Sequence, residues 1–154
     1  MGKKTNLFIG LLTAILAAVA VFVLFSTAFG ATADSVPSVR GNLFYVMFGD
    51  SDAGYSTVAG LVVAFCLLIV GFLSSLVGAF MPGKLALVPF ALSFLSLAAA
   101  GVLFIFAPQL YIAANTISPM AEDITLGTGC ICAIVFSFAP ALLSLYGSYS
   151  AFKA

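Results

Sequence analysis

Residues 57–81 read TVAGLVVAFCLLIVGFLSSLVGAFM, and residues 85–107 read LALVPFALSFLSLAAAGVLFIFA. Neither run contains Asp, Glu, Lys or Arg, and each is long enough to cross a ~30 Å hydrocarbon layer, which takes ~20 helical residues. The two runs are joined by Pro82-Gly83-Lys84. Because Pro82 cannot continue a helix and Gly83 permits a tight turn, these runs are predicted to form an antiparallel helical hairpin.

Two further uncharged runs flank this hairpin, from Leu7 to Phe29 and from Ile124 to Phe152. Strands of a membrane barrel alternate polar and apolar residues over ~10 positions, which these runs do not do. Helices satisfy their own backbone hydrogen bonds inside lipid, so all four runs are predicted to be helical. The sequence therefore predicts an all-α integral membrane protein with one membrane domain, an antiparallel up-down bundle of four transmembrane helices. Its predicted parts are spans at 7–29, 57–81, 85–107 and 124–152, external loops at 30–56 and 108–123, and a cytoplasmic turn at 82–84.

Composition excludes several classes of protein. Of the 154 residues, 64% are hydrophobic and 6% are charged, whereas a soluble domain carries about 25% charged residues. A water-soluble globule and a disordered chain are both excluded, because each needs far more charge. Five basic residues balance five acidic ones, so there is no basic patch for nucleic acid. The predicted partners are the lipid bilayer and either a second copy of the chain or another membrane protein.

The lysines predict how the chain is threaded. Lys3 and Lys4 precede the first run, Lys84 lies between the second and third, and Lys153 follows the fourth. The opposite side holds Arg40 and all of the acidic residues, Asp34, Asp50, Asp52, Glu122 and Asp123. Because Lys and Arg are retained in cytoplasmic loops, the bias predicts a cell-membrane protein with both termini in the cytoplasm.

The N-terminal run also has features of a secretory signal. Ala31-Thr32-Ala33 has the small-x-small pattern of a cleavage site, and Lys3-Lys4 precede the apolar run. However, the run from Leu7 to Phe29 is longer than the ~7–15-residue core of a signal peptide. We therefore expect this run to be retained as a membrane span.

The residue types present give no visible catalytic or metal site. The chain has no His, which removes the usual general base and the commonest metal ligand. Cys66, Cys130 and Cys132 lie in apolar runs, and two helical residues spaced like Cys130 and Cys132 point about 200° apart. The segment that starts at Asp50 lacks the Gly and Glu spacing of a calcium loop. No catalytic residue, cofactor or metal is predicted.

Small residues are predicted to mark the helix–helix contacts. Lipid tails are as apolar as leucine, so helices in a membrane associate where small side chains let their backbones approach. In the fourth run, a proline at mid-span is expected to kink the helix. An alternative interpretation is that the serines line a water-filled path. The predicted helix-packing residues are Gly60, Ala64, Gly71, Ser74, Gly78, Ser93, Ser96, Ala100 and Pro140.

The first external loop contains an apolar segment, Leu43-Phe44-Tyr45-Val46-Met47-Phe48. Six apolar residues are costly to expose to water, so the segment is expected to lie in the headgroup layer, to cover the bundle, or to contact a partner. The predicted partner-contact residues are Leu43, Phe44, Tyr45, Met47 and Phe48.

Tyrosines mark the two predicted membrane surfaces. Tyr45, Tyr55 and Tyr111 fall near the external boundary, and Tyr146 and Tyr149 fall near the cytoplasmic one. Tyrosine rings are enriched at the level of the lipid headgroups, so these side chains are expected to form aromatic belts there.

Two functions remain after these exclusions. The first is a non-catalytic multi-pass membrane protein, an accessory, assembly or structural subunit acting through its first external loop and small-residue helix faces. The alternative is a subunit of an oligomeric passive channel or small-solute transporter. Coupled carriers usually hold an ionisable residue inside the membrane, and the four apolar runs have none. No nucleophile–base pair indicates an enzyme.

Overall fold

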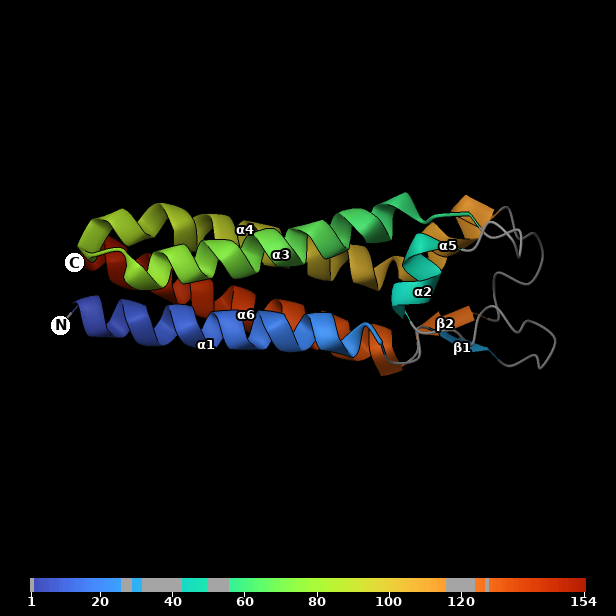
Figure 1. The fold of residues 1–154 in the computed structure, drawn as a ribbon, viewed down its shortest axis with the longest axis horizontal. Coiled ribbons are helices and arrows are strands. Elements are labelled where there is room, and N and C mark those ends of the chain that lie inside the picture. Colours follow the sequence, from blue (N-terminus) through green and yellow to red (C-terminus); the bar gives the residue numbers. More distant parts are fainter. Residues whose placement is uncertain (1, 26–28, 32–42, 50–55, 116–123, 127) are drawn as a thin grey trace.

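Four long helices form an elongated bundle in the computed structural model (Figure 1). The structure describes residues 2–25, 29–31, 43–49, 56–115, 124–126 and 128–154. The long helices are α1 (Gly2–Val23), α3 (Ala59–Phe80), α4 (Leu87–Ile105) and α6 (Thr128–Lys153). Within the described residues, these four helices are long and apolar enough to cross a membrane, which confirms the predicted number of apolar helices.

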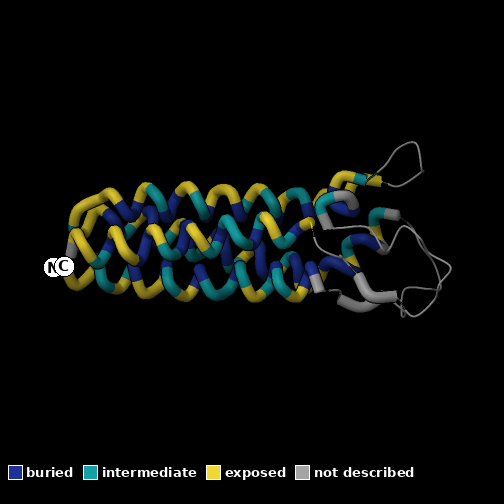
Figure 2. Tube along the Cα trace, turned by 60° about the horizontal axis from the view of Figure 1, so that its bottom comes forward, coloured by how far each residue is buried: buried dark blue, intermediate teal, exposed yellow. Residues whose placement is uncertain are grey.

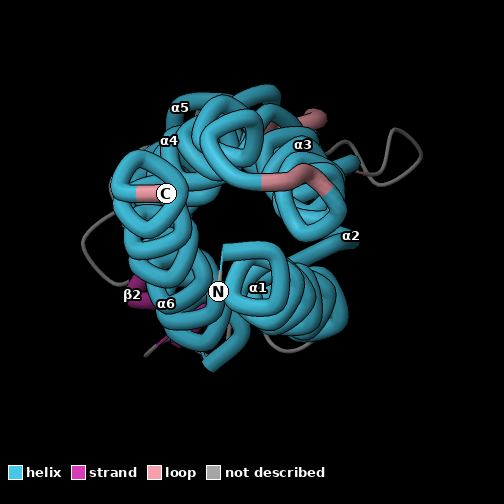
Figure 3. Tube along the Cα trace, turned by 90° about the vertical axis from the view of Figure 1, so that its left-hand side faces the viewer, coloured by secondary structure: helices cyan, strands magenta, loops and turns pink. Residues whose placement is uncertain are grey.

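The four helices surround a common axis. Helix α1 packs against α3 and α6, and α4 packs against the same two neighbours. Viewed from the end, they therefore form a ring of four (Figure 3). Both chain termini lie at the same end of this bundle (Figures 1 and 3). We call this the terminal end, and we call the other the distal end.

The turn between α3 and α4 also lies at the terminal end (Figure 1). Helix α3 stops before Pro82, and the short 3₁₀ helix η2 (Gly83–Ala86) leads into α4. Gly83 has a positive φ of 54°, a backbone conformation that glycine adopts without steric cost. The Pro-Gly pair thus separates α3 from α4 by a turn of a few residues.

The first and last long helices differ from their predicted bounds. Helix α1 begins at Gly2 and ends at Val23, although the apolar run continues to Phe29. Helix α6 begins at Thr128, although its run begins at Ile124. The released segments, β1 (Phe29–Ala31) and β2 (Ile124–Leu126), pair as an antiparallel two-stranded sheet. These strands were not predicted, because each has a partner from the opposite end of the sequence and no local signal of its own.

A fifth helix occupies part of the predicted second loop. Helix α4 ends at Ile105, and α5 (Ala107–Asn115) follows almost directly. Pro108 has no N–H and its ring would clash with the carbonyl of Phe104, which favours an end to α4 before it. In the first turn of α5 the same proline is tolerated. The predicted loop at residues 108–123 is therefore helical as far as Asn115.

Burial follows the inner stripe of each helix (Figure 2). The core is dominated by alanine, glycine and serine, with Phe90, Leu97 and Phe104 as its largest fully buried members from α4. Large apolar side chains cover the outer surface, where Phe22 is 73% exposed and Val88 is 69% exposed. This distribution reverses that of a water-soluble protein and fits a multi-pass helical membrane protein.

Candidate functional site

Helices α1 and α3 approach each other closely at Gly10, near the terminal end. A Cβ atom added to Gly10 would lie 2.5 Å from the Cβ of Ala79 and 2.7 Å from the Ser75 carbonyl oxygen. A Cβ atom on Gly71 would lie 2.5 Å from the Leu97 side chain of α4. A glycine therefore stands at the close approach in both contacts, Gly10 of α1 against α3 and Gly71 of α3 against the Leu97 side chain of α4.

The predicted helix-packing residues lie inside this chain's own bundle. All but Gly60 are buried. Gly60 is half-buried, and a Cβ atom there would lie 2.8 Å from the Leu110 side chain of α5. Their small side chains thus pack mainly within the bundle of this chain.

Other close contacts were missing from that predicted set. A Cβ atom on Gly101 would lie 2.8 Å from the Phe138 ring, and one on Gly147 would lie 3.1 Å from the Phe90 ring. A glycine inside a helix costs ~1 kcal/mol relative to alanine, so its presence there is itself a signal of close packing. The apolar pattern alone does not reveal that signal, because every helix here is rich in small residues.

One serine connects three helices. The Ser93 hydroxyl of α4 donates to the Gly71 carbonyl of α3 over 2.9 Å, and its oxygen lies 3.0 Å from the Ser144 hydroxyl of α6. Because Ser93 has one proton and directs it to Gly71, Ser144 must donate to Ser93. Both serines are fully buried, so this chain of hydrogen bonds holds α3, α4 and α6 together from within.

Other buried hydroxyl groups donate hydrogen bonds to backbone carbonyls of their own helices. Ser96 donates to the Leu92 carbonyl over 2.8 Å, Ser137 to Ala133 over 2.6 Å, and Thr13 to Ile9 over 2.8 Å. Such back-bonding satisfies a hydroxyl in an apolar setting without water. The hydroxyls of Ser96, Ser137 and Thr13 are therefore already bonded to backbone carbonyls. This favours a packing role for these residues over a role in lining a water-filled path.

The apolar loop segment forms a short helix, α2 (Leu43–Phe48), at the distal end of the bundle (Figure 1). Met47 is fully buried and Val46 is 4% exposed, and both belong to the main core. The Phe44 N–H donates to the Leu24 carbonyl over 2.9 Å, and the Val58 N–H donates to the Met47 carbonyl over 3.0 Å. Helix α2 is thus fastened to the ends of both α1 and α3.

Four phenylalanines gather around α2. The Phe44 ring lies 5.2 Å from Phe25, 4.9 Å from Phe48 and 6.0 Å from Phe65, between ring centroids. Phe25 and Phe48 remain 57% and 43% exposed. We call Phe25, Phe44, Phe48 and Phe65 the aromatic cluster. It presents rigid apolar surface at the distal end.

The predicted partner-contact residues differ in their exposure. The Met47 side chain is fully buried and packs in the main core. Phe44 is half-buried and Phe48 is exposed. The side chains of Leu43 and Tyr45 fall outside the described part of the chain.

One predicted interfacial tyrosine is also displaced inward. Tyr111 on α5 is 2% exposed and belongs to the main core, so the prediction that it lies in an aromatic belt is wrong. Helix α5 packs against α3 and α4, which places this ring in the core. At the terminal end, by contrast, Tyr146 and Tyr149 are 58% and 54% exposed.

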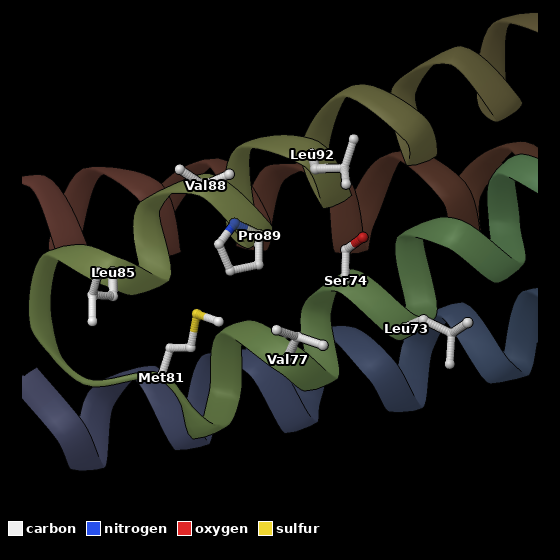
Figure 4. A pocket seen from close by; sticks show the side chains of 8 residues that line it. All are labelled: Leu73, Ser74, Val77, Met81, Leu85, Val88, Pro89 and Leu92. Carbon is white, nitrogen blue, oxygen red and sulfur yellow. The ribbon is translucent and has the colours of Figure 1, made fainter.

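A groove of about 470 Å³ runs between α3 and α4 at the terminal end (Figure 4). Apolar side chains line it almost throughout, and Ser74 of α3 supplies a hydroxyl to the lining. Its lining residues are Leu73, Ser74, Val77, Met81, Leu85, Val88, Pro89 and Leu92. A groove with this lining and no charged residue suits a hydrocarbon chain.

Comparison with protein-family models, curated proteins and solved structures found no match to this chain. Function is therefore inferred from the residues and their arrangement. Three features stand out: a tightly packed interior, an aromatic cluster at the distal end, and lysines at the terminal end.

Proposed function

We propose that this chain is a non-catalytic multi-pass protein of the cell membrane, an accessory, assembly or structural subunit. Its four long helices cross the bilayer antiparallel, up and down, with both termini in the cytoplasm. Its partner is another membrane protein or a second copy of the chain. The partner-binding surface lies at the distal end, centred on the exposed faces of Phe25 and Phe48.

The sidedness in this proposal is supported by where the cations lie. Lys3 and Lys4 begin α1, Lys84 lies in η2, and Lys153 ends α6, and all four are exposed. Both termini and the α3–α4 turn share one end of the bundle (Figure 1). Clustered lysines next to membrane spans are retained in the cytoplasm, so the terminal end is assigned to that side.

The observation that carries the proposal is the aromatic cluster. Exposed phenylalanine rings held by a buried anchor, here Met47, have little conformational freedom to lose on binding, and aromatic residues are enriched in protein interfaces. The small-residue faces are already buried within the bundle. The proposal therefore assigns partner binding to the aromatic cluster in place of those faces.

A photo-crosslinking experiment tests this assignment. Benzoylphenylalanine is placed at Phe48 in one variant and, as a matched control, at Phe152, which is 69% exposed at the terminal end. Irradiation of intact membranes is expected to give a discrete protein adduct from position 48 and none of that size from position 152. Equal adduct patterns from the two positions would contradict the proposal.

The alternative of a passive channel makes a different prediction. The buried hydroxyls of Thr13, Ser93 and Ser137 would have to exchange their backbone partners for water. Reconstituted vesicles are expected to stay impermeable to small solutes. Solute flux that Ser96→Leu abolishes would instead favour the channel, because Ser96 lies in the bundle interior.

A further inference from the structure

A second groove at the terminal end lies between α1 and α3 and has a different lining. It measures about 360 Å³ and is lined by Lys3, Lys4, Leu7, Ala79 and Phe80. Its back wall is the contact between the two helices, where Ala79 is 1% exposed. The outer edges are Leu7, 40% exposed, and Phe80, 67% exposed. The groove therefore has apolar sides and two cations at its head.

The order of these parts along the bundle fits a phospholipid, with cations beyond an apolar surface. A helix rises ~1.5 Å per residue, so Lys3 lies about one turn, ~6 Å, beyond Leu7 along α1. Lysine chains also extend toward the headgroup layer while their stems cover apolar surface. Lys3 and Lys4 thus lie at the level of the lipid phosphates, and the apolar part of the groove lies at the level of the acyl chains.

The charges that line the groove favour an anionic occupant. In the part of the chain that the structure describes there is no Asp or Glu side chain; the acidic residues are Asp34, Asp50, Asp52, Glu122 and Asp123, all outside it. Lys153 lies 4.6 Å from the centre of the Tyr149 ring, so that cation already faces an aromatic partner. Lys3 and Lys4 instead face the groove, and an anionic lipid supplies their complement.

We propose that the groove between α1 and α3 binds an anionic phospholipid of the cytoplasmic leaflet, with its phosphate at Lys3 and Lys4 and an acyl chain along Leu7 and Phe80. The groove between α3 and α4 lies at the same end but has no lysine in its lining. That groove accepts hydrocarbon without regard to headgroup charge. The inference rests on the membrane insertion in the proposed function and not on the partner-binding role of the aromatic cluster.

The absence of tryptophan from the sequence allows a direct test. Phe80→Trp places one indole in the α1–α3 groove, and Leu85→Trp, at a residue equally exposed at 67%, places one in the α3–α4 groove. Each variant is reconstituted in vesicles of phosphatidylcholine mixed with phosphatidylglycerol, one of the two lipids being brominated near the carboxyl end of its acyl chain. Quenching of the indole reports which lipid occupies each groove.

The expected result is a preference for phosphatidylglycerol of roughly 5- to 30-fold in the Phe80→Trp variant, because each lysine contributes about five-fold, and no preference in the Leu85→Trp variant. Adding Lys3→Gln and Lys4→Gln to Phe80→Trp should reduce its preference to about one-fold. The charge-matched control, Lys84→Gln with Lys153→Gln, should leave that preference unchanged. Circular dichroism checks that each variant is folded.

Two outcomes would overturn the inference. One is equal quenching of the Phe80→Trp indole by both lipids, and the other is an equal loss of preference in the two lysine pairs, which would indicate general surface attraction. In both cases the indoles would still be quenched, so membrane insertion would stand. Failure of either bromolipid to quench either indole would instead contradict the insertion itself.

Discussion

Gly10 of α1 and Ala79 of α3 bring two helix backbones into contact. A Cβ atom on Gly10 would lie 2.5 Å from the Ala79 Cβ and 2.7 Å from the Ala79 Cα. These distances leave no room for even a methyl group unless the helices move apart. The contact also forms the back of the groove that we assign to an anionic lipid.

Gly10→Ala is therefore expected to destabilise the bundle by roughly 1–3 kcal/mol, because the added carbon meets backbone atoms that cannot rotate away. Gly78→Ala is the matched control: its Cβ would lie 3.2 Å from the Phe90 ring, which can shift slightly. The helical preference of alanine over glycine, up to ~1 kcal/mol, offsets much of that smaller clash. The free energy of unfolding is measured by denaturation in mixed detergent micelles. Equal stability of the Gly10→Ala variant and the parent chain would contradict the close approach.

The Ser93–Ser144 pair predicts an asymmetric double-mutant cycle. Ser93→Ala removes the bond to Gly71 and also leaves the Ser144 hydroxyl without its acceptor, whereas Ser144→Ala removes one bond. The first variant is expected to lose more stability than the second, and their coupling should be near ~0.6 kcal/mol, the average for such bonds inside membranes. Unfolding of the two single variants and the double variant measures the coupling. Purely additive effects would show that the two hydroxyls do not interact.

Met47 is expected to anchor α2, and Phe48 is expected to act mainly at the surface. Met47→Ala removes a fully buried side chain and should cost about 2–5 kcal/mol at the distal end. Hydrogen exchange should then rise at the Val58 amide, which bonds the Met47 carbonyl. Phe48→Ala, at a 43% exposed position, should change stability little and should reduce partner crosslinking from a probe at Phe25. A large loss of stability in the Phe48→Ala variant, together with little loss in the Met47→Ala variant, would contradict this assignment.

Topology gives a prediction that does not depend on a partner. In a variant whose native cysteines are replaced by alanine, Ser38→Cys should react with an impermeant maleimide on intact cells, and Lys84→Cys should react only after permeabilisation. Lys84 is exposed in the α3–α4 turn, while Ser38 lies outside the described residues and is placed by the charge pattern alone. The reverse labelling would contradict the assigned sidedness.

The parts of the fold that depend on neighbouring residues in the sequence were predictable. Pro82-Gly83 ends one helix and starts the next through backbone properties of those two residues, and the uncharged runs determine which segments are helical. The ends of α1 and α6 were not predictable in the same way. Phe29 and Leu126 are apolar enough to extend a helix, yet each leaves it to pair with the other, far along the sequence.

For the residues at the distal end, too, the sequence predicted apolar character, and the tertiary structure decided which side chains are buried. The apolar character of Leu43–Phe48 indicated burial or contact, but its alternating exposure, with Met47 inside and Phe48 outside, required the position of the bundle end. Tyr111 had the sequence context of an interfacial residue and is nevertheless in the core. In both cases the deciding neighbours belong to other helices.

The sequence by itself determined that the chain has four uncharged helical runs and that its lysines lie on one side of them, because hydrophobicity and charge are properties of each residue and act over a fixed bilayer thickness. The tertiary structure alone decided which glycines touch a neighbouring backbone, which serine bridges three helices, and that Lys3 and Lys4 share a groove with Phe80. In a chain this rich in small and apolar residues, many helix faces have nearly the same composition. The choice among them is made by van der Waals fit between helices, and that fit exists only once the helices have packed together.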